Sequence, residues 1–161
     1  MRKSRRQSIR ERDGFCCVYC GTTEVDVSSA LTLDHVQPRS EGGTNALDNQ
    51  VYCCHACNEF KGEYWQREPN LRLLHPLVDV LAEHCREQEN GTLLGLTERG
   101  INHIQRLRLN REQLVTHRLR EQARLMKDLR YDEMEKFIAE LEHKEAKNQK
   151  RMRNQRRNPE P

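Results

Sequence analysis

The sequence predicts an α+β fold: a small domain near the N-terminus followed by a mainly helical extension. Two short strand-like segments, at 31–36 and 51–53, precede a helix-like segment from residue 54, and two cysteine pairs flank this unit. From residue 114 onward, apolar residues recur at helical spacing. A chain of 161 residues with 35% hydrophobic side chains supplies one modest core rather than two.

The first predicted strand is Leu31–Val36, which alternates apolar and polar residues and stops before Pro38. Residues 39–50 are rich in Gly, Asn and Asp, which is typical of a loop, and 51–53 forms the second strand. The helix that follows is expected to end or bend at Gly62. The expected order is therefore strand, loop, strand and helix.

Seven cysteines occur in a chain without a recognisable secretory signal, so we expect a cytoplasmic protein with reduced thiols rather than disulfides. Two pairs have C-x-x-C spacing, and four thiolates are the ligand set of a tetrahedral structural zinc ion. Redox pairs, or a mixed site using His55, are less economical alternatives. The four expected zinc ligands are Cys17, Cys20, Cys54 and Cys57. The three cysteines interpreted as small hydrophobic residues are Cys16, Cys53 and Cys85.

Three segments of the chain together resemble the HNH endonuclease family. They are LDHVQPRSEGG at 33–43, the Asp48-Asn49 pair, and CHACNEFKG at 54–62. The resemblance covers about residues 5–65 and implies a ββα-metal (HNH) nuclease core that hydrolyses DNA phosphodiester bonds with a divalent cation. The family's signature positions fall on His35, Asn49 and Asn58, the HNN variant.

This resemblance assigns roles to individual residues. His35 is expected to act as the general base, because a neutral imidazole can accept the proton of the attacking water at physiological pH. Asp34 and Asn58 are expected to hold one Mg²⁺ or Mn²⁺ ion, since hard cations prefer oxygen ligands. Asn49 would orient His35 or tie the neighbouring loop to it. Two further residues are interpreted as phosphate contacts to DNA: Lys61 and Arg39.

Other classes of function fit parts of the sequence. The alternative to a nuclease is a non-catalytic zinc-containing nucleic-acid-binding module that keeps the cysteine frame. A protein-binding adaptor is a third reading, in which a homodimer or a partner protein would use the helix 114–141. The intact set of Asp34, His35 and Asn58 favours the enzyme.

The charge distribution favours a polyanionic partner. The net charge is only +3, but residues 1–12 carry +5, residues 13–98 carry −9 and residues 99–130 carry +6. An acidic middle indicates a site that attracts metal cations, and basic segments on either side indicate arms that hold nucleic acid.

The predicted organisation has four parts: 1–66 is the nuclease core, 67–110 a hairpin and helix extension, 111–147 a charged helical segment, and 148–161 a basic tail expected to be disordered. Asn90-Gly91 indicates a hairpin turn, Thr97 a helix start, and Asn110 the start of a capping box. The apolar stripe after residue 114 rotates, so we expect a helix that breaks near Tyr131 or curves around a partner.

Overall fold

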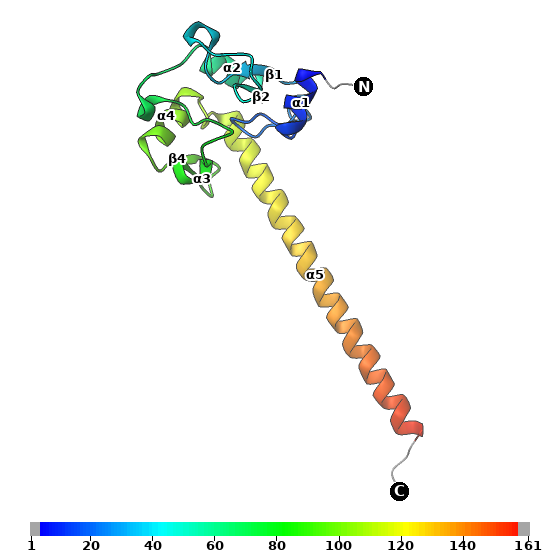
Figure 1. Ribbon diagram of the computed structural model, residues 1–161. Coiled ribbons are helices and arrows are strands. Elements are labelled where there is room, and N and C mark those ends of the chain that lie inside the picture. Colours follow the sequence, from blue (N-terminus) through cyan, green and yellow to red (C-terminus); the bar gives the residue numbers. More distant parts are fainter. Residues whose placement is uncertain (1–3, 158–161) are drawn as a thin grey trace. The chain divides into compact units, whose positions relative to one another are not determined.

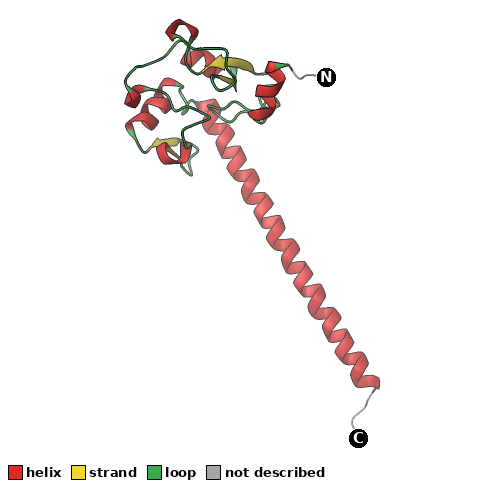
Figure 2. Cartoon of the chain, in the orientation of Figure 1, coloured by secondary structure: helices red, strands yellow, loops and turns green. Residues whose placement is uncertain are grey.

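The computed structural model describes residues 4–157 and confirms the α+β class (Figures 1 and 2). Residues 1–119 form one compact unit and residues 120–161 a second. The helices are α1 (Arg5–Arg12), α2 (His55–Lys61), α3 (Leu81–His84), α4 (Glu98–Arg106) and α5 (Glu112–Arg157). The strands are β1 (Thr32–His35), β2 (Gln50–Cys53), β3 (Cys85–Glu87) and β4 (Leu93–Gly95), and short 3-10 turns occur at Arg39–Glu41 and Pro69–Leu71.

Strands β1 and β2 pair antiparallel, and their register places Asp34 opposite Val51 and His35 opposite Gln50. Successive side chains of a strand point to opposite faces. Asp34 is accordingly buried, while His35 is half-buried. All four residues of β2 are buried, so this strand forms the centre of the core.

Helix α2 begins and ends where the sequence predicts. Its N-cap is Cys54, whose sulfur accepts a hydrogen bond from the Cys57 amide, and its C-cap is Gly62 at φ +53°. A residue without Cβ adopts that backbone conformation most easily. The same cysteines that start the helix belong to the expected zinc site.

The loop between β1 and β2 is closed by the side chain of Asn49. Its Oδ1 accepts from the Gln37 amide at 2.8 Å, and its Nδ2 donates to the carbonyls of Gln37 (3.1 Å) and Thr44 (2.8 Å). The chain passes so close at Gly43 that a Cβ there would lie 1.8 Å from the Gln37 carbonyl oxygen. Glycine is therefore required at this position.

Residues 5–12 of the basic N-terminal segment, expected to be an arm that holds nucleic acid, form α1 and are built into the fold, and residues 1–3 lie outside the described part. Arg6 donates to the Leu31 carbonyl, Arg10 pairs with Glu24, and Arg12 donates to the Gln50 carbonyl at 2.7 Å. These three guanidinium groups therefore satisfy acceptors of the protein itself. The charge count alone could not distinguish this use from binding a polyanion.

The extension packs on the core within the first unit. Strands β3 and β4 form an antiparallel hairpin around Asn90-Gly91, and Thr97 caps α4 by accepting from the Gly100 amide. Asn110 does not act as the expected helix cap. Its side chain instead bonds both the amide and the carbonyl of Leu93, because that edge of β4 needs partners.

Helix α5 is continuous from Glu112 to Arg157, so the expected break near Tyr131 is absent from it. The segment contains neither Gly nor Pro, the residues that most often interrupt a helix. It runs through residues 148–157, for which composition suggests disorder, and residues 158–161 lie outside the described part. In residues 4–157, no helix is both long and apolar enough to cross a membrane.

Candidate metal centre and active site

The four cysteines of the two C-x-x-C pairs meet at one point. Their sulfur atoms all lie within 4.8 Å of one another, and Cys20 Sγ is 3.8 Å from Cys54 Sγ. A tetrahedron with Zn–S bonds of about 2.3 Å has S–S edges of about 3.8 Å. The cluster therefore fits a four-thiolate metal such as zinc, as predicted from spacing.

Hydrogen-bond donors surround these sulfurs. The Cys57 amide lies 3.4 Å from Cys54 Sγ, the Thr22 hydroxyl 3.1 Å from Cys20 Sγ, and Arg111 Nη2 3.6 Å from Cys57 Sγ. Four thiolates with one divalent cation carry a net charge of −2, and donors of this kind stabilise that charge. Arg111 comes from beyond the predicted core of residues 1–66, so a later part of the chain contributes to the metal centre.

The other three cysteines lie outside this cluster within the described residues. Cys53 is fully buried in β2, and burial raises the pKa of its thiol. A protonated, enclosed thiol is inert, as expected for a small hydrophobic residue.

Asp34 lies on the inner face of β1 and both of its oxygens are engaged. Tyr19 donates to Oδ2 at 2.8 Å, and Lys61 Nζ donates to Oδ1 at 3.1 Å. Burial raises the pKa of Asp34, and the nearby Lys61 ammonium opposes that shift. The sequence indicates the strand position but not these two partners.

Lys61, expected to contact phosphate, is only 1% exposed. Its ammonium also donates to the His35 carbonyl at 2.7 Å, so it joins α2 to β1. The physical reason is the buried carboxylate of Asp34, which needs a counter-charge. In this arrangement Lys61 is not available to a phosphate, whereas Arg39 is exposed on its 3-10 turn.

His35 contacts two side chains that sequence reasoning missed. Its Nε2 is 2.8 Å from Asn45 Oδ1 and 3.2 Å from Gln50 Nε2. Gln50 could have been found from the strand register, because it lies directly opposite His35. Asn45 carries no such signal. The Asn49 side chain bonds Gln37 and Thr44 and closes the loop, and within the described residues it makes no hydrogen bond to the His35 ring.

Asn58 follows Cys57 on α2 and is half-buried. Within residues 4–157 its side-chain amide makes no hydrogen bond, so its carbonyl oxygen is free to accept a ligand. The Asp34 carboxylate also keeps acceptor capacity, since an ionised carboxylate offers about four lone-pair positions and two are used. These oxygens are the donor type that Mg²⁺ or Mn²⁺ takes.

A cleft lies between the β1–β2 loop and the segment after residue 74. The residues that line it are Gln37, Gly42, Thr44, Asp48, Asn49, His75, Leu77 and Val78. Asn49 thus helps form the wall of a depression next to the loop that carries Asn45.

A two-stranded antiparallel sheet followed by a helix, with a cysteine quartet at the helix start, defines a ββα-metal domain. Residues 17–72 match the family described as HNH endonuclease, so this segment is an HNH domain. The segment is also similar to the CRISPR-associated endonuclease Cas9 of Corynebacterium diphtheriae, with 41% identity over 59 residues. That match covers 36% of this chain and 5% of the relative, so the chain spans a small part of it. No solved structure matches the chain.

Proposed function

We propose that the protein is a metal-dependent DNA endonuclease that hydrolyses phosphodiester bonds. The match of residues 17–72 to HNH endonucleases supports a nuclease. The observation that carries the proposal is the placement of His35. Its ring is half-buried on β1, one nitrogen is held by Asn45, and Lys61 ties its backbone to the helix that carries Asn58.

In this proposal His35 is the general base. If Nε2 carries the proton and donates it to Asn45 Oδ1, Nδ1 keeps a lone pair that can accept a proton from water. Within the described residues Nδ1 makes no hydrogen bond, so the lone pair is available. In this tautomer the 3.2 Å contact between Gln50 Nε2 and His35 Nε2 is not a hydrogen bond, because both atoms are donors. Asn45 is then the partner that sets the direction of the ring.

Asp34 and Asn58 would hold the divalent cation, Mg²⁺ or Mn²⁺. When bound, such an ion stabilises negative charge on the phosphoryl and departing oxygens. Asp34 keeps its carboxylate oriented through Tyr19 and Lys61. The position of Asn58 depends on Cys57, so the structural metal holds the ligand-bearing helix in place.

The test is incubation of the purified protein with supercoiled plasmid DNA, with Mg²⁺ or Mn²⁺ and with a chelator as the metal-free arm. Loss of the general base in His35→Ala should lower the cleavage rate by about 10² to 10⁴. The matched control is His143→Ala, an exposed histidine on α5, which should cut at the parental rate. Equal rates for both variants would overturn the role of His35.

The alternative, a non-catalytic nucleic-acid-binding module, gives a different result in the same experiment. The parental protein would then bind plasmid and leave it uncut with either metal. A structured RNA tested beside the plasmid separates a DNA substrate from an RNA substrate.

A further inference from the structure

Three arginines, at the end of α4 and in the turn that follows it, lie over aromatic rings of α2 and of the segment after α2. The guanidinium carbon of Arg108 is 4.8 Å from the Phe60 ring centroid, and that of Arg111 is 5.4 Å from the same ring. The guanidinium carbon of Arg106 is 4.7 Å from the Tyr64 ring centroid. We call these five residues the arginine surface. Stacking of this kind orders a long side chain and leaves N–H groups at the guanidinium edge available.

The positive charge of this surface is not neutralised by carboxylates. Within residues 4–157, none of its three arginines forms an ion pair. Arg10 also stacks on a ring, that of Phe15, but its charge is paired with Glu24. Between residues 99 and 111 the chain contains four arginines and no acidic residue. Of these four, Arg99 is paired with Asp79.

The three guanidinium groups differ in how much the protein uses them. Arg106 donates to the Lys61 carbonyl at 3.2 Å. Arg111 donates to Cys57 Sγ and to the carbonyls of Leu107 and Arg108, so the protein uses it most. Arg108 is exposed, and its side chain makes no hydrogen bond in the described part of the chain. Its contact is with the Phe60 ring, which holds the guanidinium but leaves all of its donors free.

The backbone of Arg108 adds a second observation. Its φ is +49°, a left-handed conformation that Gly or Asn adopts at lower cost. The fold uses the Arg108 side chain only through its contact with the Phe60 ring, so the strained backbone is consistent with a role of the guanidinium group outside the fold. At Arg108 that side chain is an unpaired, pre-oriented guanidinium group.

We propose that the arginine surface binds the phosphate backbone of the nucleic acid. This inference rests on the proposed nuclease function and extends it beyond residues 17–72. Guanidinium groups match phosphate geometry and contact it without reading base sequence. The rings lie beneath guanidinium groups, which favours contact with the backbone over stacking with bases.

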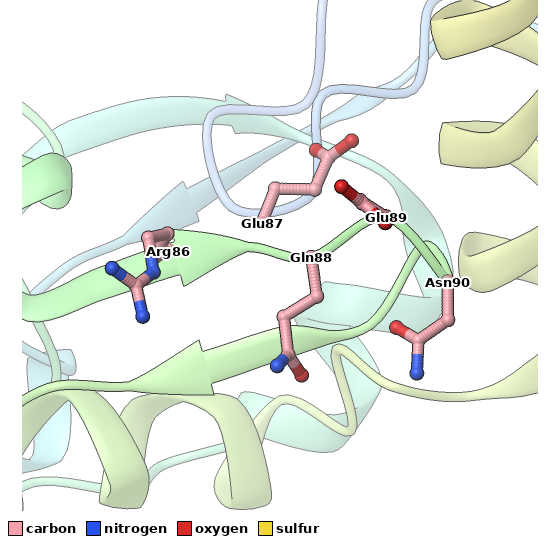
Figure 3. Close-up of a pocket in the computed structure, with 5 residues that line it drawn as sticks. All are labelled: Arg86, Glu87, Gln88, Glu89 and Asn90. Carbon is pink, nitrogen blue, oxygen red and sulfur yellow. The ribbon is translucent and has the colours of Figure 1, made fainter.

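The β3–β4 hairpin offers a contrast on the same unit. A depression at its tip is lined by Arg86, Glu87, Gln88, Glu89 and Asn90, and the two carboxylates project near each other (Figure 3). This acidic tip is unsuited to a polyanion. Arg86 is exposed like Arg108, so it provides a matched control for the loss of one positive charge.

The first experiment measures affinity for a fluorescently labelled DNA duplex at several salt concentrations. Each phosphate contact contributes about 0.9 to the slope of log affinity against log salt. Replacing both residues in Arg106→Gln/Arg108→Gln should therefore lower the slope by about 1.8, whereas Arg86→Gln should leave it unchanged. A double variant with the parental slope would refute the inference, provided that its zinc content and melting temperature match the parent.

The second experiment separates a binding role from a structural role. Arg108→Gly relieves the left-handed backbone, so its melting temperature should equal or exceed that of the parent while its duplex affinity falls. A lower melting temperature with parental affinity would show that Arg108 serves the fold, and would overturn the inference.

The two proposals fail differently. If the parental protein binds the duplex through these arginines but never cuts plasmid, the nuclease proposal fails and the arginine surface stands. If it cuts plasmid and the arginine variants keep the parental slope, the nuclease proposal stands and the arginine surface fails.

Discussion

The buried ion pair between Lys61 and Asp34 should make the ββα core sensitive to loss of one charge. The two side chains are 2% and 7% exposed, and Lys61 Nζ also satisfies the His35 carbonyl. Lys61→Met keeps the length of the side chain but removes the counter-charge of the buried Asp34 carboxylate, which then has only Tyr19 as a donor, and it removes the donor to the His35 carbonyl. Breaking one partner of such a pair costs about 3–5 kcal/mol, which is a large share of the 5–15 kcal/mol typical of a domain.

The assay is chemical denaturation of zinc-loaded protein, with Lys61→Met, Asp34→Asn and the double variant forming a cycle. The double variant should recover much of the lost stability, because it removes both charges. The pKa of Asp34 should rise further in Lys61→Met, since the ammonium opposes the effect of burial. A cost below about 1 kcal/mol for Lys61→Met would refute the buried-pair argument, because that is the range of an exposed pair.

Three further outcomes are expected. Cys54→Ala should lose the metal and unfold the core, because metal binding supplies folding energy in small domains, while Cys85→Ala should keep its zinc by metal analysis. Burial lowers the pKa of His103 to about 4, so the folded protein favours the neutral imidazole. The contribution of His103 to the free energy of unfolding is therefore complete above pH 6.5 and declines as the pH falls toward 4. The loss should reach about 3 kcal/mol, and His103→Asn, which keeps an acceptor for the Leu74 amide, should flatten this pH profile in thermal melts. The hydrogen bond from Arg10 lowers the pKa of Glu24 to about 2, so the contribution of Glu24 to stability is complete above about pH 4.5 and is lost as the pH falls to 2. In Glu24→Gln, thermal melts should no longer show this loss between pH 4.5 and 2.

The parts of the site that the sequence predicts are those with local signals. The C-x-x-C spacing identified the four sulfurs, and alternation with turn residues placed the strands and the end of α2 at Gly62. Cysteine spacing is informative because a metal imposes a fixed geometry on its ligands. The family resemblance gave Asn49 a role toward His35, whereas its side chain bonds Gln37 and Thr44.

The parts that could not be predicted depend on contacts between distant segments. Asn45 reaches His35 because the loop folds back, and Lys61 turns inward because a carboxylate is buried beneath it. Arg12 looks like any basic residue until its carbonyl partner is known. Charge counts record how many basic groups exist, but they do not show which acceptors lie within reach.

Helix α2 shows why those distant contacts matter for function. It has seven residues, and isolated helices shorter than about 12–15 residues are marginal in water, so its own propensity cannot hold Asn58 in position. At its start, Cys54 and Cys57 belong to the metal cluster. At its end, the Lys61 carbonyl accepts a hydrogen bond from the Tyr64 amide at 3.0 Å and another from Arg106 at 3.2 Å. The catalytic amide in our proposal is therefore positioned by the metal on one side and by α4 on the other. The segment after residue 72 thus helps to hold α2 in place.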